Sequence, residues 1–232
     1  MRFLYLGVGA AALTMNYVIT ALMLSLALLA ACTAPSAPST TGNAIAIDAE
    51  GSPAVRQLPP LPDGDYALDA AASSLRYDVS KIASNPHTGN VAIKSGSLVI
   101  EDGIVTEGDY VVDLTKITED ANNERYLKHI RSADFFDIEK FPTSQFIITD
   151  VTPGTGGYAV TGDLTIKDIT KELTFPATVE ADAEGLRVKA KFTINRLDWN
   201  MTYASGTLFQ QLGDKAIKDE IGYEFSLVFV QS

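Results

Sequence analysis

The side chains that most often carry catalysis or bind metals are scarce in this chain. Its 232 residues include one Cys, Cys32, and two His, His87 and His129. One Cys cannot form an intrachain disulfide or a Cys-rich structural zinc site, and two His leave little room for a His-based catalytic metal centre. Neither His stands in a pattern typical of a metal site or a catalytic triad. We therefore expect no metal site, and we expect both His to be structural or solvated.

Carboxylates are plentiful, with 29 Asp and Glu against 18 Lys and Arg and a net charge of −11. This excess of acid argues against a nucleic-acid partner, because phosphate binding needs clustered Lys and Arg. Paired carboxylates can hydrolyse glycosides, but most of these acids alternate with apolar residues on expected strands, and no pair stands out with separated pKa values. We therefore expect no catalytic residue, no enzyme activity and no cofactor. A small hydrolase would lose its activity on a single Asp or Glu substitution.

The lone Cys has a chemical role suggested by its position. Residues 17–31 are apolar and end in small residues, as in the h-region and cleavage site of a secretory signal. The run Leu29-Ala30-Ala31-Cys32 resembles the lipobox of bacterial lipoproteins. In that family the Cys is acylated and the peptide before it is removed. The resemblance implies a signal peptide over residues 1–31 and a lipid anchor at Cys32, where several acyl chains hold stably to a membrane.

Some features of this N-terminal region leave alternatives open. Residues 17–31 alone are short for a membrane span of about 20 residues, but residues 4–31 are long enough for a retained signal anchor. Met15 is a second candidate start, although it leaves no positive charge ahead of the apolar run. In the lipoprotein sorting pattern an Asp after the Cys retains the protein at the inner membrane. Thr33 stands there, which favours a lipid-anchored periplasmic protein at the outer membrane of a Gram-negative bacterium.

Residues 32–63 differ in composition from what precedes and follows them. Six of the ten prolines fall here, at positions 35, 38, 53, 59, 60 and 62, and Ser, Thr, Ala and Gly fill most of the rest. Such a segment buries too little apolar surface to offset its ordering entropy. The composition predicts a disordered linker that holds a domain off the membrane.

Residues 64–232 are expected to form one β-rich domain. Apolar and polar residues alternate with period two in five stretches, and turn signals such as residues 101–103, 153–157 and 183–185 separate the strands. The stretches are residues 75–79, 158–166, 173–179, 186–194 and 223–230. Because strands follow one another without helical crossovers, the sheet should be antiparallel. The glycines of residues 153–157 lack the Lys and Ser or Thr of a phosphate-binding loop, so they predict a hairpin turn.

One stretch breaks the strand pattern and supplies the best candidates for ligand contact. Residues 120–130 read as a short helix with Asp or Asn at its start, and residues 134–142 are dense in aromatics among acids. A helix between strands often plugs or lids a barrel, and about eight closed strands leave room for side chains or one small ligand. The candidate cavity-lining residues are Tyr126, Leu127, Ile130, Phe135, Phe136 and Phe141. Ordinary core packing is the alternative for the same set.

A second group of candidates follows residue 195. Trp199 and Tyr203 suit a site with one apolar and one wet end, so they are candidates for the mouth of a cavity, with core or rim packing as the alternative. Arg196 is a candidate partner for a phosphate or quinone oxygen, or else a structural bridge to Asp198 or another acid.

Five segments, in order and with the right spacing, resemble the YceI-like family of bacterial envelope proteins. The most specific is residues 126–142, a helix followed by a Ser-x-x-Phe-Phe-Asp-x-x-x-x-Pro run. The others are Tyr66-Ala67-Leu68-Asp69 with Ser73-Ser74-Leu75, then residues 162–171, residues 192–200 and residues 213–221. The sequence departs from the family at Asp168, where Gly is usual, and at residues 86–91, which lack the Phe of a His-Val-x-Gly-x-Phe-like segment.

The resemblance implies an all-β, eight-stranded antiparallel lipocalin-like barrel with a short helix between strands. It implies an elongated apolar tunnel that binds a polyprenyl lipid or an isoprenoid quinone, and a protein that is not an enzyme. Family members can dimerise, so a homodimer stays open. The alternative function is a filled barrel that acts as an envelope stress or protein-interaction module without a lipid ligand.

Overall fold

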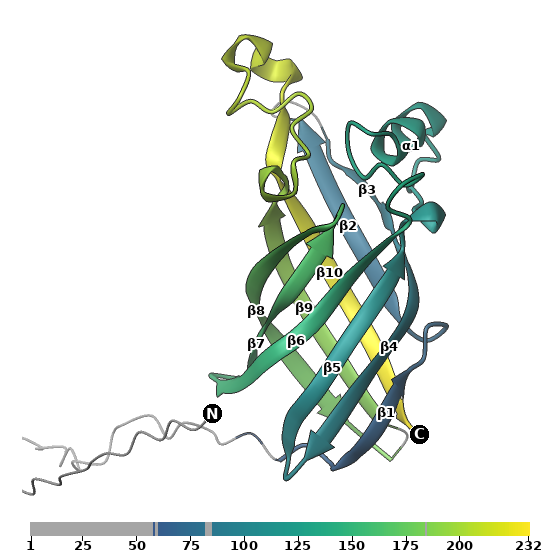
Figure 1. Ribbon diagram of the computed structural model, residues 1–232, viewed down its shortest axis with the longest axis vertical. Coiled ribbons are helices and arrows are strands. Elements are labelled where there is room, and N and C mark those ends of the chain that lie inside the picture. The colour runs from purple at the N-terminus through teal and green to yellow at the C-terminus, as the bar shows by residue number, and fades with distance from the viewer. Residues whose placement is uncertain (1–57, 59, 82–84, 184) are drawn as a thin grey trace, which may run out of the picture. The chain divides into compact units, whose positions relative to one another are not determined.

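The computed structural model describes residue 58 and residues 60–81, 85–183 and 185–232 (Figure 1). The expected signal peptide, Cys32 and nearly all of the expected linker lie outside these residues, so the expectations for them stay predictions. Residues 51–232 form one compact unit. The buried apolar residues of the described chain run from Leu61 to Phe229 and form one cluster, so this unit carries its own core and closes its own sheet. We therefore treat residues 51–232 as a domain that folds on its own.

Strands make up most of the described chain. The ten strands of the sheet are β1 (Gly64–Leu68), β2 (Ser74–Lys81), β3 (His87–Asn90), β4 (Ala92–Glu101), β5 (Ile104–Asp113), β6 (Thr143–Gly154), β7 (Gly157–Ile166), β8 (Ile169–Ala181), β9 (Gly185–Asn195) and β10 (Ile217–Gln231). One α-helix, α1 (Glu124–Arg131), and three short 3-10 helices, η1 (Leu114–Lys116), η2 (Arg196–Trp199) and η3 (Gln210–Lys215), lie between them. In the described residues we find no helix with the length and apolar character to span a membrane.

The sheet closes into a barrel of eight antiparallel strands. Its order is β1-β4-β5-β6-β7-β8-β9-β10, and a β1–β10 pairing completes the ring. The long strand β10 pairs with β1 over residues 229–231 and with β2 over residues 217–226, so β1 and β2 share one edge of it. Strand β3 pairs with β2 and stands just ahead of β4. The predicted all-β, eight-stranded antiparallel barrel is confirmed.

The period-two alternation of the sequence places apolar side chains inside the barrel. In β2, Leu75, Tyr77 and Val79 are buried while the residues between them are exposed or half-buried, because successive side chains of a strand point to opposite faces. The tight β7–β8 turn has Lys167 at φ 52° and Asp168 at φ 58°. This left-handed backbone favours Gly and tolerates Asp or Asn best among other residues, which explains why Asp168 replaces the usual Gly there.

The helix forms where the sequence predicts one, but it starts later. Asn122 has a left-handed φ of 53°, and the side chain of Asn123 accepts a hydrogen bond from the backbone N–H of Tyr126 at 3.1 Å. Asn123 is thus the N-cap, and α1 runs from Glu124 to Arg131 rather than from residue 120. Its buried residues are Leu127 and Ile130.

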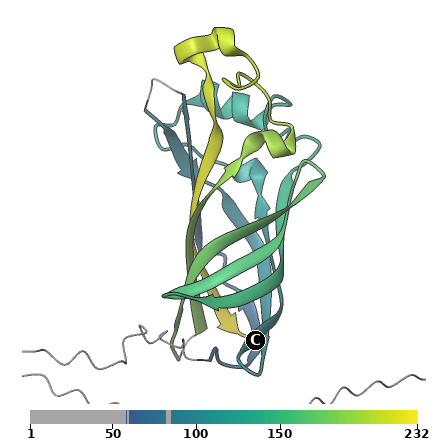
Figure 2. The ribbon, with the colours of Figure 1, turned by 90° about the vertical axis from the view of Figure 1, so that its left-hand side faces the viewer.

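The two ends of the barrel differ. Helix α1 and the η2–η3 connection lie together at one end, which we call the α1 end, and both ribbon views agree on this (Figures 1 and 2). The chain enters at the opposite end, where Leu61 is buried in the core and Asp63 accepts a hydrogen bond from the backbone N–H of Gly103 in the β4–β5 turn at 2.8 Å. Access to the interior from the α1 end is therefore controlled by α1 and residues 200–216.

Candidate ligand-binding site

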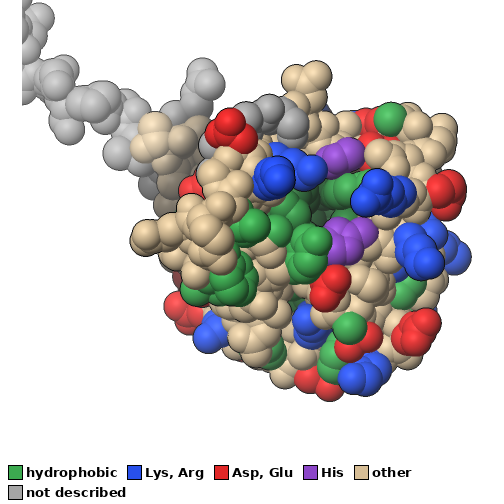
Figure 3. All heavy atoms as spheres, turned by 90° about the horizontal axis from the view of Figure 1, so that it is seen from above, with side chains coloured by type: hydrophobic (Ala, Val, Ile, Leu, Met, Phe, Trp, Pro, Cys, Tyr) green, Lys and Arg blue, Asp and Glu red, His purple; other side chains and the backbone are tan. Residues whose placement is uncertain are grey.

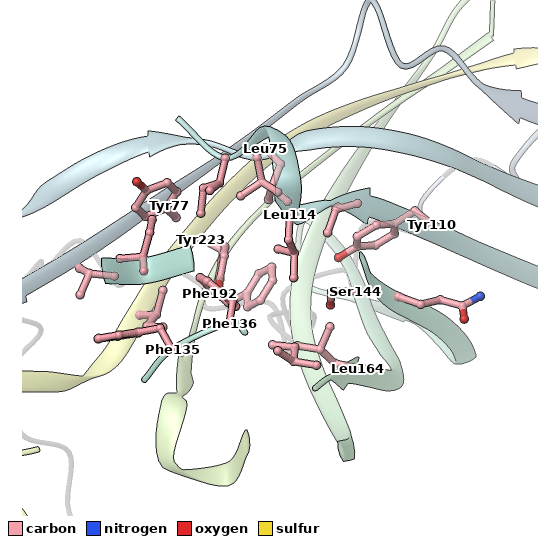
Figure 4. A pocket seen from close by; sticks show the side chains of 18 of the residues that line it. Leu75, Tyr77, Tyr110, Leu114, Phe135, Phe136, Ser144, Leu164, Phe192 and Tyr223 are labelled. Atoms are coloured by element: carbon pink, nitrogen blue, oxygen red, sulfur yellow. The ribbon is translucent and has the colours of Figure 1, made fainter. Parts of the chain in front are cut away.

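An apolar cavity of about 50 Å³ lies inside the barrel next to α1 (Figure 4). We call it the upper cavity. Strands β2, β5, β7 and β10 supply inward-facing side chains, and α1 and the loop after it close one side. Its lining includes Leu75, Tyr77, Val79, Val112, Leu164, Ile166, Phe192, Ile221 and Tyr223, together with Tyr126, Ile130, Phe135 and Phe136. No Asp, Glu, Lys, Arg or His is among the described residues that line it.

The polar side chains of the upper cavity are uncharged, and they are hydroxyls together with the amide of Gln145. The Tyr77 hydroxyl donates to the Thr118 carbonyl at 2.8 Å, and the Ser144 hydroxyl donates to the Thr165 carbonyl at 2.7 Å. Burial raises the pKa of Tyr77 to about 12, and it also raises the pKa of Tyr110 and Tyr223 above the usual range of a phenol. All three phenols therefore stay uncharged at neutral pH, and the cavity suits an apolar or neutral polar group.

A second cavity of about 50 Å³, the lower cavity, lies toward the end where the chain enters. It is apolar except for Asp109 at its edge. The side chains around it include Leu61, Leu98, Val105, Ile148, Val151, Val160, Val179, Leu186, Leu227 and Phe229. Apolar surfaces of this kind accept hydrocarbon and offer few hydrogen bonds to anything else.

Aromatic side chains separate the two cavities. Tyr110 lines both of them, and its ring lies 5.5 Å from that of Phe146 and 6.0 Å from that of Phe225. Phe175 stacks on Phe192 with ring centroids 4.5 Å apart and meets Phe225 edge-on at 5.8 Å. We call these five residues the aromatic cluster. The aromatic cluster fills the middle of the barrel. The interior is therefore apolar along its length, but its free volume is divided into two cavities.

A cleft of about 730 Å³ opens at the α1 end (Figure 3). Residues of β2, α1 and the η2–η3 connection form its walls. Val79, Tyr126 and Phe135 line both this cleft and the upper cavity. The path from solvent into the barrel therefore passes these three side chains.

The structure brings five of the nine predicted ligand-contact residues together. Tyr126, Ile130, Phe135 and Phe136 line the upper cavity, and Tyr203 lines the cleft above it. The Tyr203 ring packs edge-on against His129 at 4.3 Å. The helix and the Phe-Phe pair that follows it thus face the same space, while contact with a ligand stays a prediction.

The other four predicted residues line neither cavity nor the cleft. Leu127 is buried in the core, Phe141 is half-buried, and Trp199 is 2% exposed, with its indole N–H donated to the Leu164 carbonyl at 3.2 Å. Leu127 and Trp199 therefore correspond to core packing, the alternative that the sequence left open for them, while Phe141 lies outside the core cluster.

Arg196 makes its contacts inside the fold. Its side chain is fully buried and pairs with Asp219 at 3.0 Å, a different acid from its neighbour Asp198. The guanidinium also donates to the carbonyls of Met201, Ile217 and Lys218. Burial lowers the pKa of Arg196, and Asp219 opposes that shift. Because its donors are used inside the fold, Arg196 ties the η2–η3 connection to β10, which corresponds to the structural bridge that the sequence analysis gave as the alternative.

Several lining residues were absent from the sequence-based candidates. They include Tyr77, Tyr110, Phe192 and Tyr223, which come from four strands. The alternating pattern assigns each of these residues to one of the two faces of its strand. It does not show which inward-facing residues of different strands meet across the barrel. The two His lie on the cleft wall, where His87 stacks on Tyr126 at 4.0 Å and contacts Glu119 at 3.0 Å.

The chain is similar to UPF0312 proteins of several bacteria. It is 31% identical over 116 residues to the UPF0312 protein of Shewanella denitrificans, covering 49% of this chain and 61% of that protein. It is 34% identical over 126 residues to the UPF0312 protein of Vibrio campbellii, covering 52% of this chain and 64% of that protein. The similarity thus spans less than two thirds of the length of these relatives.

Solved structures of other bacterial proteins share the fold. Burkholderia cenocepacia BcnA aligns with a TM-score of 0.58 at 22% identity, covering 69% of this chain and 98% of that chain. A polyisoprenoid binding domain from Saccharophagus degradans, implicated in plant cell wall breakdown, aligns with a TM-score of 0.58 at 17% identity, covering 72% and 98%. The sequence profile of the YceI-like domain matches residues 66–229, which confirms the resemblance seen in the five segments: the chain belongs to the YceI-like family.

Proposed function

We propose that this domain binds an isoprenoid lipid, either a polyprenyl chain or an isoprenoid quinone, inside the barrel and catalyses no reaction on it. The observation that carries the proposal is the apolar interior. An uncharged upper cavity and a mostly apolar lower cavity lie in one closed barrel, and the upper one shares Val79, Tyr126 and Phe135 with the open cleft. The fold shared with a polyisoprenoid binding domain supports the proposal.

Hydrophobic burial supplies the driving force. Each CH₂ group moved from water into this interior contributes about 0.8 kcal/mol, so several prenyl units outweigh the cost of ordering a flexible chain. The neutral hydroxyls of the upper cavity and the polar walls of the cleft suit the headgroup, while the lower cavity suits the tail. In this arrangement the protein orients and shields its ligand and needs no cofactor.

Binding requires the aromatic cluster to move. Each cavity of about 50 Å³ holds only about three water-sized molecules, which is far less than a prenyl chain needs. Rotation of rings such as Phe192 and Phe225 would join the two cavities. The same small volumes favour the second candidate function, a filled barrel that acts as an envelope stress or protein-interaction module.

A direct test uses residues 51–232 produced in bacteria and purified without detergent. Lipid extraction followed by mass spectrometry should find a prenyl lipid or quinone, and added ubiquinone should bind. Val112→Phe, which enlarges a buried side chain on the upper cavity, should abolish uptake. Val230→Phe makes the same change at a side chain that is 37% exposed and should leave uptake intact. Repeated absence of lipid together with no quinone uptake would favour the filled barrel.

We further propose that the protein is lipid-anchored through Cys32 on the periplasmic side of a Gram-negative outer membrane. The support is the Leu29-Ala30-Ala31-Cys32 run and the Thr that follows it. Labelled palmitate should be incorporated into the full chain and not into Cys32→Ser, and only the unchanged chain should fractionate with the outer membrane. Equal labelling of both chains, or a chain that keeps residues 1–31, would overturn the anchor.

A further inference from the structure

The cleft at the α1 end is positively charged in an otherwise acidic domain. Between residues 65 and 232 acidic residues outnumber basic ones by 26 to 16. Yet the described residues that line the cleft include no Asp or Glu, while its cations are Lys81, Arg125, Lys128 and Lys215, with His87 and His129 beside them. Seen from above, blue and purple side chains border a green hollow, with red side chains among them (Figure 3).

These four cations are exposed, and no described carboxylate forms an ion pair with them. In the part of the chain that the structure describes, none of them takes part in an ion pair. Two acids of this end pair with the histidines: Glu119 with His87 at 3.0 Å, and Asp134 with His129 at 3.6 Å. The lining of the cleft therefore presents its positive charges without a carboxylate among the described lining residues.

Exposed apolar side chains lie at the same end. Tyr203 is 46% exposed, Leu208 is 51% exposed and Phe209 is 40% exposed, and all three belong to the η2–η3 connection. The other large apolar side chains with comparable exposure among the described residues, Ile104, Ile147 and Val230, are spread over three strands. The concentration of three within seven residues is therefore specific to the α1 end.

We propose that the α1 end docks on an anionic membrane surface. Lys and Arg beside exposed Leu, Phe and Tyr are the combination that attracts lipid headgroups and then inserts at the boundary with the acyl chains. In this orientation the cleft opens onto the bilayer, and a prenyl chain passes between membrane and barrel with little exposure to water. The docking goes beyond the proposed lipid binding, because it needs no ligand in the barrel and is tested without one.

Vesicle cosedimentation of residues 51–232 tests the proposal, with vesicles of equal parts phosphatidylcholine and phosphatidylglycerol and vesicles of phosphatidylcholine alone. The domain should bind the anionic vesicles at low salt and be released in about 1 M salt, where charges are screened within about 3 Å. Since each surface cation contributes about five-fold to binding, Arg125→Gln with Lys128→Gln should weaken binding about 25-fold. Leu208→Ser with Phe209→Ser should weaken it about ten-fold.

A matched control removes the same charge elsewhere. Lys189→Gln with Lys191→Gln changes two exposed cations of β9, on the barrel wall, which pair with Glu180 and Glu224, and should leave vesicle binding within about two-fold. Circular dichroism establishes that each variant is folded. Equal loss in the cleft and control variants, or no binding to anionic vesicles at low salt, would overturn the docking surface. Ubiquinone uptake measured on the same variants without vesicles reports on the proposed function separately.

Discussion

Replacing Phe225 with Ala should join the two cavities and make the interior receptive to a prenyl chain. Phe225 is 4% exposed, and its ring contacts those of Tyr110, Phe175 and Phe192 at centroid distances of 6.0, 5.8 and 6.1 Å. Loss of a buried Phe costs about 3 to 5 kcal/mol, of which the three ring pairs account for about 0.5 to 1.5 kcal/mol each. Because domains are stable by about 5 to 15 kcal/mol, the variant should fold with a clearly lower melting temperature.

A lipid that enters the barrel should restore much of this loss. A chain that fills the space of the missing ring buries about four CH₂-sized groups there, which is worth about 3 kcal/mol. Farnesol, a short prenyl alcohol, should therefore raise the melting temperature of Phe225→Ala by several degrees more than that of the unchanged domain. At about 2 to 4 °C per kcal/mol for a domain of this size, thermal scans with and without farnesol resolve the difference.

The matched control is Trp199→Ala. Trp199 is 2% exposed and lines neither cavity, so its loss has a similar cost but leaves a void off the proposed lipid path. Farnesol should give this variant no extra stabilisation. If farnesol stabilises both variants equally, or neither more than the unchanged domain, then the barrel centre is not a lipid path and the reasoning fails.

Three further predictions concern the framework of the site. Arg196→Met leaves Asp219 and three carbonyls without their buried donor, so urea unfolding should show a loss of about 3 to 5 kcal/mol; a loss under about 1 kcal/mol contradicts this role. Gly89→Ala places a Cβ against the Thr118 carbonyl and should cost about 1 to 3 kcal/mol, whereas Gly154→Ala, whose Cβ meets nothing closer than 3.7 Å, should be nearly neutral. The hydrogen bond from His87 lowers the pKa of Glu119 below its ordinary 4.5. The ionised Glu119 therefore stabilises the folded domain above pH 4.5, and this stabilisation is lost as the pH falls through the lowered pKa. The free energy of unfolding of Glu119→Gln should therefore fall less between about pH 5 and about pH 3 than that of the unchanged domain, and identical pH profiles would rule out this contribution.

Local sequence signals identified the helix, although not its first residue, and five of the ten strands, namely β2, β7, β8, β9 and β10. The alternation of Leu75, Tyr77 and Val79 with polar residues marks β2 and its inner face, because side chains on a strand alternate with period two. Asn123 ahead of an apolar stripe marks α1, because a side-chain acceptor satisfies free backbone N–H groups at a helix start. Both signals lie within a few residues of the element they describe.

The site was only partly accessible from the sequence, since its members come from distant strands. Tyr77 and Tyr110 share the upper cavity only because β10 pairs with both β1 and β2 and so closes the ring. Arg196 and Trp199 are of residue types that suit a binding site. In the fold, however, their polar groups bond to other groups of the protein interior. Residue type therefore indicated the chemistry, and packing determined which side chains were available for it.

The sequence by itself determined the alternating strands, the capped helix, the family and the acidic character of the domain. Only the tertiary structure decided that the interior holds two small cavities separated by the aromatic cluster, and that cations line the cleft at the α1 end although acids predominate overall. The physical reason is that secondary structure follows from neighbours in the chain, whereas free volume and local charge depend on which distant side chains pack together when the barrel closes.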